Sequence, residues 1–486
     1  MNASAEAGPP GYLWPRWLFL RALGLIFLSA FYSFAFQVHG LIGERGILPA
    51  GEYLALVHRE LPGIRQFWYA PTLLWFNAGD TTLTLIVAAG VVCSLLLVAN
   101  IAPKVTVALC TLLFLSCIAA LQDFSSYQSD GMLLEAGFLS IFFAPRGRRP
   151  KLGGTDPPSA LSLFMLRWEW FRIYFESGVV KLASGDPHWR DFTAMDEYYQ
   201  NGPLPTWIGW YVQHLPHWYH AGTVIFTLLV ELVIVCAVFL PRRFRLTCAA
   251  IVTALQIGII ATANYAFLNY LVLALGVLLL DDRFLERWLP LQAEDSAVPA
   301  ARHPITQWAE RGVLGYLFCA TVVAFFVQSA FSSWSRPFRV LDPFRIANAY
   351  GLFAVMTEGR YEIEFQGSLD GVLWVAYPFR YKPQDPGEHP GIYAPYQPRF
   401  EWNLWFASLG PWQQSPWVVQ AQKRLIEGSP AVLQLFKRDP FAGKRPALVR
   451  TVLWRYWFTD LATKRKTGAW WRRTEIGPFT GVVGRP

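Results

Sequence analysis

Residues 181–207 read KLASGDPHWRDFTAMDEYYQNGPLPTW, a polar and aromatic stretch that lies between two long apolar segments. A connection between membrane helices needs only a few polar residues, and loops of this length without a regular pattern are usually functional or disordered. The high aromatic content argues against disorder. We therefore expect residues 183–217 to form an ordered loop that lies against a membrane surface.

The composition is that of a membrane protein with additional soluble mass. Of the 486 residues, 53% are hydrophobic and only 16% are charged, compared with about 25% charged residues in soluble domains. Runs of about 20 apolar residues mark candidate membrane spans. Nine segments approach this pattern, at residues 14–38, 81–99, 104–122, 129–145, 160–182, 218–240, 246–262, 264–280 and 312–331. We predict a polytopic α-helical membrane bundle with about nine spans over residues 1–332.

Positive charge in the short loops predicts the orientation of these spans. Arg and Lys cluster at residues 146–151, after the fourth predicted span, and at residues 242–245, after the sixth. Because such clusters stay on the cytoplasmic side, the N-terminus is predicted to be cytoplasmic. The loop 183–217 and everything after residue 332 are then extracytoplasmic. The polar segment 281–311 is expected to be a cytoplasmic linker.

A second, soluble α+β domain is predicted over residues 340–486. The alternating residues 360–366, the turn signal at 368–371 and the aromatic run 372–381 predict a β-hairpin. Further elements are expected as helices at 402–409 and 417–436 and as strands at 451–458 and 469–476. From residue 332 onward there are 21 Lys and Arg but only 12 Asp and Glu, a net charge of +9. This charge favours contact with lipid headgroups or with an acidic partner.

Charged residues inside two predicted spans form a candidate intramembrane site. The spans 160–182 and 218–240 carry Arg172, Glu176, Lys181, His220 and Glu231. Charges at membrane depth are costly, tend to pair, and face a bundle interior or a wet cavity. Two interpretations stay open, a structural ladder of ion pairs and a polar cavity. Glu231 needs a cationic partner from another span, and Arg172 or Arg21 is the expected one.

Neither the cysteines nor the histidines form a recognisable site. The six cysteines lie in apolar runs without a C-x-x-C motif and are expected to be small buried hydrophobic residues. The spacing His214-x-x-His217-x-x-His220 is interrupted by Pro216, and no further ligands complete a zinc set. Catalytic, nucleotide-binding and nucleic-acid-binding motifs are absent from the sequence. The sequence therefore predicts no metal, no cofactor, no assigned catalytic residue and no nucleic-acid partner.

Two groups of residues are candidates for binding another protein. The segment 394–406 is rich in the residue types that anchor protein interfaces, and its candidates are Tyr396, Gln397, Arg399, Trp402 and Trp405. The loop 183–217 adds Asp186, Trp189, Arg190 and Tyr199 on the same predicted side of the membrane. The first group is equally compatible with a proline-rich corner that packs against the core of its own domain.

Taken together, these segments resemble the lipase maturation factor family. The resemblance rests on GVVKLASGDPHWRD at 178–191, NAYGLF at 348–353, APYQPR at 394–399, WRYWFT at 454–459 and WWRR at 470–473. It extends from about residue 14 to residue 480. So many ordered segments in the same order make a chance resemblance improbable.

The resemblance implies a membrane-bound factor that assists the folding and assembly of secreted lipases or similar hydrolases. It implies a lipase-like client, and we expect the two groups of candidate residues to form the client-binding surface, with membrane lipids as a further partner. Family members in animals act in the membrane of the endoplasmic reticulum, with the C-terminal domain in the lumen. The C-terminal domain here has neither a cysteine nor a glycosylation sequon, and the chain ends without a retrieval signal. These features favour a bacterial inner-membrane member with a periplasmic C-terminal domain.

An enzymatic alternative stays open. The membrane half is distantly similar to the helical bundle of vitamin K-dependent carboxylases. This similarity implies an integral-membrane enzyme, carboxylase-like or lipid-modifying, with its site at the five intramembrane polar residues. Such an enzyme would depend on Lys181 and Glu231, whereas a non-enzymatic maturation factor would tolerate their replacement if it stayed folded.

Overall fold

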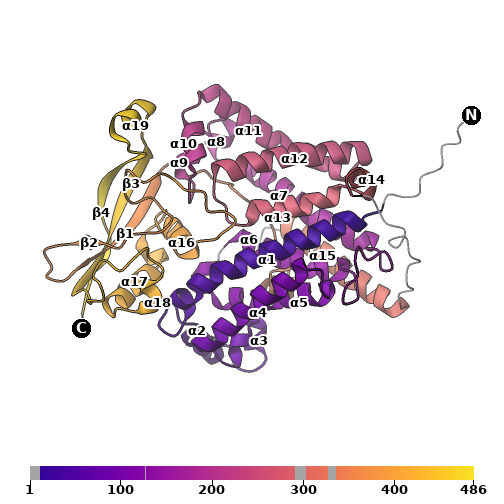
Figure 1. The fold of residues 1–486 in the computed structure, drawn as a ribbon, viewed down its shortest axis with the longest axis horizontal. Helices are drawn as coiled ribbons and strands as arrows, with labels where there is room; N and C mark the ends of the chain where they lie inside the picture. Colours follow the sequence, from indigo (N-terminus) through magenta and orange to yellow (C-terminus); the bar gives the residue numbers. More distant parts are fainter. Residues whose placement is uncertain (1–10, 126, 290–302, 327–334, 486) are drawn as a thin grey trace, which may run out of the picture.

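The computed structural model describes residues 11–125, 127–289, 303–326 and 335–485 and consists of a helical bundle joined to a C-terminal region with a small sheet (Figure 1). The long helices of the bundle are α1 (Leu13–Ile42), α4 (Asp80–Val98), α5 (Pro103–Ala120), α6 (Gln128–Phe143), α7 (Ala160–Ala183), α11 (His217–Leu232), α12 (Arg242–Thr262), α13 (Leu268–Gly276) and α15 (Pro304–Phe326). The 3₁₀ helices η3 (Ile234–Phe239) and η4 (Val277–Leu279) extend α11 and α13.

Short helices connect the long ones. They are α2 (Ala50–Glu60), α3 (Arg65–Tyr69), η1 (Leu73–Trp75), η2 (Gln122–Ser125), α8 (Pro187–Arg190), α9 (Tyr198–Asn201), α10 (Trp207–Gln213), α14 (Asp282–Leu285) and η6 (Arg339–Phe344). Three of them, α8, α9 and α10, lie in the loop 183–217, so this loop is ordered as predicted.

Each of the nine predicted spans overlaps one of the long helices. Within the described residues, six helices are long and apolar enough to cross a membrane, namely α1, α4, α5, α11 with η3, α12 and α15. The other three differ for identifiable reasons. Helix α6 has only 16 residues, α13 with η4 is shorter still and covers Leu268–Leu279, and α7 is long enough but carries several charges. The count of nine spans therefore stays a prediction.

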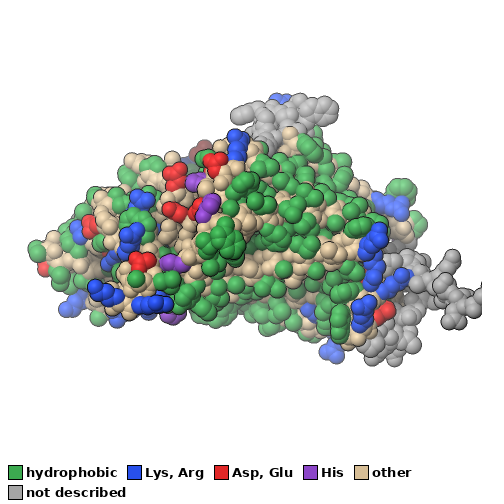
Figure 2. Space-filling model, turned by 90° about the horizontal axis from the view of Figure 1, so that it is seen from above, with side chains coloured by type: hydrophobic (Ala, Val, Ile, Leu, Met, Phe, Trp, Pro, Cys, Tyr) green, Lys and Arg blue, Asp and Glu red, His purple; other side chains and the backbone are tan. Residues whose placement is uncertain are grey.

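The surface of the helical half is apolar, as expected of a membrane bundle. Figure 2 shows hydrophobic side chains over most of the visible face of this half, whereas Lys and Arg side chains gather toward the ends of the molecule. Two cysteines lie on this outer surface, since Cys236 and Cys319 are exposed. The prediction of six buried cysteines is wrong for these two, because an apolar helix facing lipid does not bury its outer side chains in protein. All six are free thiols.

The C-terminal region contains a four-stranded antiparallel sheet with the strand order β2-β1-β3-β4. Its elements are β1 (Arg360–Ser368), β2 (Val375–Ala376), α16 (Arg399–Ala407), η7 (Trp412–Gln414), α17 (Trp417–Ile426), α18 (Pro430–Leu433), β3 (Leu448–Phe458), α19 (Leu461–Thr467) and β4 (Trp471–Gly484). The predicted hairpin and both later strands are confirmed, although β2 has only two residues.

The predicted helix 417–436 is interrupted. Helix α17 ends at Ile426, and Gly428 follows in a left-handed conformation with a φ of +67°. Pro430 then begins the separate helix α18. Glycine at such a position ends a helix without steric cost, and proline is favoured at the first position of a new one.

The linker predicted at 281–311 is described only in part. Helix α14 lies at its start and α15 begins at Pro304, earlier than the predicted span at 312. Residues 290–302 of the linker and residues 327–331 of the last predicted span lie outside the described residues.

The two predicted domains share one interface. Helices α16 and α18 pack against α1, and α16 also packs against η2. At Gly40 of α1 the approach is so close that a Cβ atom would lie 2.6 Å from the carbonyl oxygen of Ala431 and 2.7 Å from Cγ of Leu435. Only glycine leaves room for this contact.

We expect Gly40→Ala to destabilise the protein by about 1–3 kcal/mol, the usual cost of overpacking a tight contact. The measurement is the apparent melting temperature of the purified full chain in detergent. Gly222→Ala is the matched control, because Gly222 is a helical glycine whose Cβ would meet no atom within 4 Å. An equal melting temperature for Gly40→Ala and the wild type would contradict the described packing of α18 on α1.

Candidate functional site

A buried ion pair joins the C-terminal region to the bundle. The guanidinium of Arg399, at the start of α16, donates to both carboxylate oxygens of Asp130 on α6, at 2.6 and 2.7 Å. It also donates to the carbonyl of Phe124 at 3.0 Å and lies 4.7 Å from the ring centre of Phe34. Both charged residues are fully buried. Asp130 lies in the first turn of α6, where the helix dipole also favours a negative charge.

Most of the first group of candidate residues lies inside this interface. Gln397, Arg399, Trp402 and Trp405 are buried, and Tyr396 is half-buried. The indole N–H of Trp405 donates to the carbonyl of Asn201 at 3.0 Å. The geometry fits the packing interpretation of this segment, since direct contact with another protein requires exposed side chains.

The second group ties the loop 183–217 to the segment after η6. Asp186 caps α8 through the N–H of His188 and also accepts the N–H of Met356 at 2.6 Å. The indole N–H of Trp189 donates to the carbonyl of Phe353 at 3.0 Å. Asp186, Trp189 and Tyr199 are buried, whereas Arg190 is exposed. Arg190 is therefore the member of this group best placed to reach a partner.

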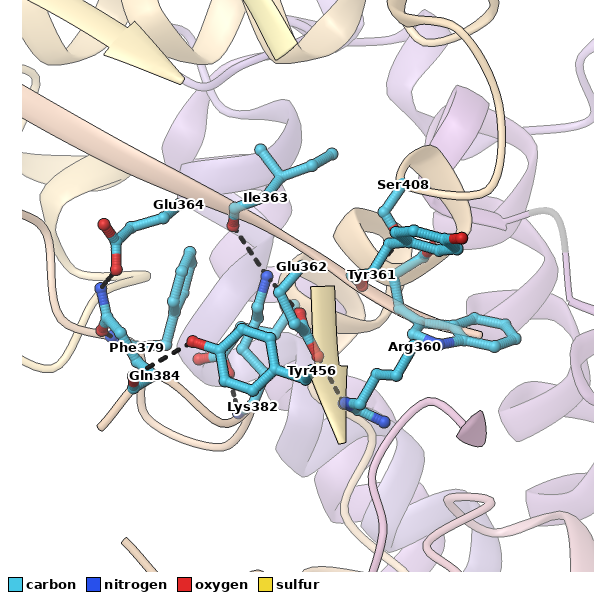
Figure 3. A network of polar contacts seen from close by, with 12 residues as sticks. Arg360, Tyr361, Glu362, Ile363, Glu364, Phe379, Lys382, Gln384, Ser408 and Tyr456 are labelled. Atoms are coloured by element: carbon cyan, nitrogen blue, oxygen red, sulfur yellow. Dashed lines mark hydrogen bonds and ion pairs between the residues drawn. The ribbon is translucent and has the colours of Figure 1, made fainter. Parts of the chain in front are cut away.

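Arg360 of β1 anchors the middle of the same loop, and Figure 3 shows its contact with Glu362. Its guanidinium donates to the carbonyls of Gln200, Gly202 and Pro203 and pairs with Glu362 at 2.5 Å. The ammonium of Lys382 lies 2.7 Å from the other oxygen of Glu362 and donates to the carbonyl of Ile363 at 2.8 Å. This network fixes the loop on the sheet.

Sequence reasoning assigned no role to Arg360, Glu362 or Lys382. One signal was available, because Arg360 and Glu362 are two residues apart on a predicted strand and so share one of its faces. Opposite charges on one strand face indicate a pair. The sequence gives no comparable indication that the backbone carbonyls of Gln200, Gly202 and Pro203 complete the network.

Two carboxylates outside the bundle hold turns of the C-terminal region. Glu401 accepts the backbone N–H groups of residues 380–382 at 2.7–2.9 Å, and burial raises its pKa to about 7. Asp370 is exposed and accepts the N–H groups of Val372 and Leu373 at 2.9 Å, which lowers its pKa. These hydrogen bonds of Asp370 hold the β1–β2 turn together although the turn is exposed to solvent.

The polar residues that the sequence predicts within the membrane separate into two clusters. In the first, Arg172 pairs with Glu135 and lies 4.0 Å from Glu176. Both carboxylates also accept hydrogen bonds from the C-terminal region. The N–H of Tyr350 donates to Glu176 at 2.6 Å, and the N–H of Asn348 donates to Glu135 at 3.0 Å.

In the second cluster, Lys181 of α7 donates to both oxygens of Glu231 on α11 at 2.8 Å. The expected partners of Glu231 were wrong. Arg172 pairs with Glu135, and Arg21 donates to the carbonyl of Leu97 and the side chain of Asn100. The spacing of charges along one helix shows which of them share a face. It does not show which charge on another helix they pair with.

A cavity of about 310 Å³ borders the second cluster, with Lys181 and Glu231 in its wall. Arg172, Glu176 and His220 are buried but are not part of this wall. His220 instead packs with its ring centre 5.6 Å from that of Tyr199. The five predicted residues therefore do not surround a single cavity.

The described residues contain no group of three His, Cys, Asp or Glu side chains that could hold a metal ion. The three histidines in i, i+3, i+6 spacing have separate neighbours. His214 contacts the carbonyls of Trp210 and Thr459, His217 contacts Asp196, and His220 packs on Tyr199.

Comparison with known proteins gives matches over both halves of the chain. The family models described as lipase maturation factor transmembrane domain and lipase maturation factor C-terminal domain match residues 14–287 and 346–481. Lipase maturation factor 2 of Gallus gallus is 31% identical, with 97% of this chain and 82% of the relative covered. Lipase maturation factor 1 of Bos taurus is 31% identical, with coverages of 98% and 90%.

Lipase maturation factor 2 of Homo sapiens is 30% identical, with 96% of this chain and 82% of the relative covered. No solved structure matches the chain. The matches include the helical bundle, the sheet and the residues that join them, and the protein belongs to the lipase maturation factor family.

Proposed function

We propose that this protein is a membrane-bound maturation factor that assists the folding and assembly of secreted lipases or similar hydrolases. The observation that carries the proposal is the family match over both the bundle and the C-terminal region, together with relatives named lipase maturation factor 1 and 2. These relatives favour a maturation factor over an integral-membrane enzyme with a site in the bundle.

The proposed topology has nine spans, a cytoplasmic N-terminus and an extracytoplasmic C-terminal region. Contacts among the predicted cytoplasmic segments support it. Arg16 near the start of α1 donates to carbonyls of residues 152–156. The backbone N–H groups of residues 13 and 14 donate to Asp282, and Arg242 pairs with Asp281. These segments therefore gather at one end of the bundle.

The predicted extracytoplasmic segments gather with the C-terminal region at the other end. The loop 183–217 contacts β1 through Arg360, and the link between α5 and α6 contacts α16 through Arg399. In a bacterium this end would lie in the periplasm, and in a eukaryote it would lie in the lumen of the endoplasmic reticulum. The net charge of +9 after residue 332 supports an additional contact with anionic lipid headgroups.

The tip of the β1–β2 hairpin is our proposed contact for the client. Leu369, Val372 and Leu373 are 49%, 83% and 68% exposed, an unusual concentration of apolar side chains on one turn. The strand β2 lies on the side of the C-terminal region away from the bundle (Figure 1). An exposed apolar tip in this position suits the exposed apolar surface of a partly folded hydrolase.

We expect the triple variant Leu369→Ser, Val372→Ser, Leu373→Ser to lower the yield of active secreted client severalfold. The abundance and melting temperature of the factor should stay unchanged, because these side chains are exposed. The assay coexpresses a secreted lipase from the same source with each variant and measures its activity per molecule of factor. Val482→Ser is the matched control, since Val482 is 57% exposed on β4. Unchanged client yield in the triple variant would exclude the hairpin tip as the contact.

A variant in the interface should behave differently. Arg399→Met leaves the buried carboxylate of Asp130 without its cation, which costs about 3–5 kcal/mol. We expect factor abundance, measured by immunoblot of membranes, to fall in parallel with client yield. Adding Asp130→Leu should recover part of the abundance, because the buried charge is then removed as well.

Lys437→Met is the control for the loss of a cation, because Lys437 pairs with Glu388 at the exposed surface. Such surface pairs contribute only about 0–1 kcal/mol to the free energy of unfolding, so the abundance of this variant should stay unchanged. Full abundance of Arg399→Met combined with lost client yield would instead identify Arg399 as a client-binding residue.

A further inference from the structure

The cavity beside Lys181 has the size and lining of a site for a small apolar molecule. It lies among α7, α11, α12 and α13, and its wall is mostly apolar. Trp189 and Tyr199 of the loop 183–217 and Phe353 of the C-terminal region complete the wall. Ligand sites are typically cavities of about 300–1,000 Å³ with an apolar lining and a few polar groups, and the volume of about 310 Å³ falls within this range.

The cavity reaches the outer surface of the bundle between α11 and α12. Phe226 on α11 and Ala254 and Gly258 on α12 are in its wall and are also exposed. Ala254 and Gly258 are one helical turn apart, and their small size leaves a notch in the surface of α12. A Cβ atom at Gly258 would meet nothing within 4 Å. Because α11 and α12 are both long and apolar enough to cross a membrane, this opening faces the hydrocarbon part of the bilayer.

The inner end of the cavity is polar but has no net charge. Lys181 and Glu231 are both buried and neutralise one another. Two of the three N–H donors of the Lys181 ammonium go to Glu231. Within the described residues this leaves one donor for a molecule in the cavity. A row of side chains in the same wall, Asn269, Gln256 and Tyr174, is joined by hydrogen bonds of 2.6 and 2.8 Å.

We propose that this cavity binds an uncharged membrane lipid. A hydroxyl or ester carbonyl oxygen of the lipid accepts a hydrogen bond from Lys181, and its hydrocarbon chain passes out between α11 and α12. An anionic or zwitterionic headgroup is disfavoured, because burying a charge without a partner is costly and Lys181, the one cation among the described residues of the wall, is already paired with Glu231. The site involves no reaction and is independent of the hairpin tip proposed as the client contact.

Photolabelling of the full chain in detergent tests this proposal. The probe is a diacylglycerol with a diazirine in one acyl chain, and labelled peptides are identified by mass spectrometry. We expect labelling on α11, α12 and the inner part of α7. Gly258→Phe fills the notch with a side chain and should lower this labelling at least fivefold. Gly222→Phe is the matched control, because Gly222 is also exposed on a membrane helix but does not line the cavity.

Three results would overturn the proposal. They are equal labelling of wild type and Gly258→Phe, labelling confined to peptides outside the cavity wall, and preferential labelling by a fatty acid or phosphatidylcholine carrying the same diazirine. Melting temperatures and size-exclusion profiles establish that each variant is folded. If Gly258→Phe is not folded, Ala254→Phe provides the same test from the adjacent turn of α12.

Discussion

The ion pair between Arg399 and Asp130 joins residues that are 269 positions apart in the sequence. Both lie in a fully buried environment, where an unpaired charge would cost several kcal/mol. The same relation recurs nearby, since Asn348 and Tyr350 donate to the carboxylates of Glu135 and Glu176. The bundle therefore contains acidic groups whose partners come from the C-terminal region. The packing of the bundle thus depends on this region. The position of the loop 183–217 follows from the same constraint, because Arg360 holds its backbone carbonyls against the sheet.

The elements of the fold could be predicted well from the sequence, because their signals are local. Runs of apolar residues placed a helix in each of nine segments, and alternation with a turn signal placed the β1–β2 hairpin. Gly428 and Pro430 also indicate the break between α17 and α18, but the amphipathic periodicity of residues 417–436 continues across them and predicts one helix. The number of spans is harder to predict from the sequence, because the charges on α7 suit a membrane helix only when they have partners such as Glu135, and the sequence does not show these partners.

The candidate sites were harder to predict, for a physical reason. Arg, Trp and Tyr anchor interfaces between proteins, and they anchor interfaces between parts of one protein by the same contacts. The sequence therefore does not show whether Arg399 and Trp405 contact a client or residues of the same chain. In the structure their partners are Asp130 and Asn201. The partner of Glu231 could not be chosen by helical periodicity, which describes one helix at a time. The exposed tip at Leu369–Leu373 carried a turn signal only, and its apolar exposure became visible with the packing of the sheet.

The long separation between Asp130 and Arg399 also has a consequence for biosynthesis. In a chain that grows from its N-terminus, α6 is made long before α16. During this interval the carboxylate of Asp130 lacks its native cation, and Glu135 and Glu176 lack their donors at 348–350. The half-made bundle is thus held in a less stable state until translation has nearly finished. A chain that stops early leaves these groups without their C-terminal partners, which gives the proteolytic machinery of the membrane a physical basis for distinguishing incomplete copies from complete ones.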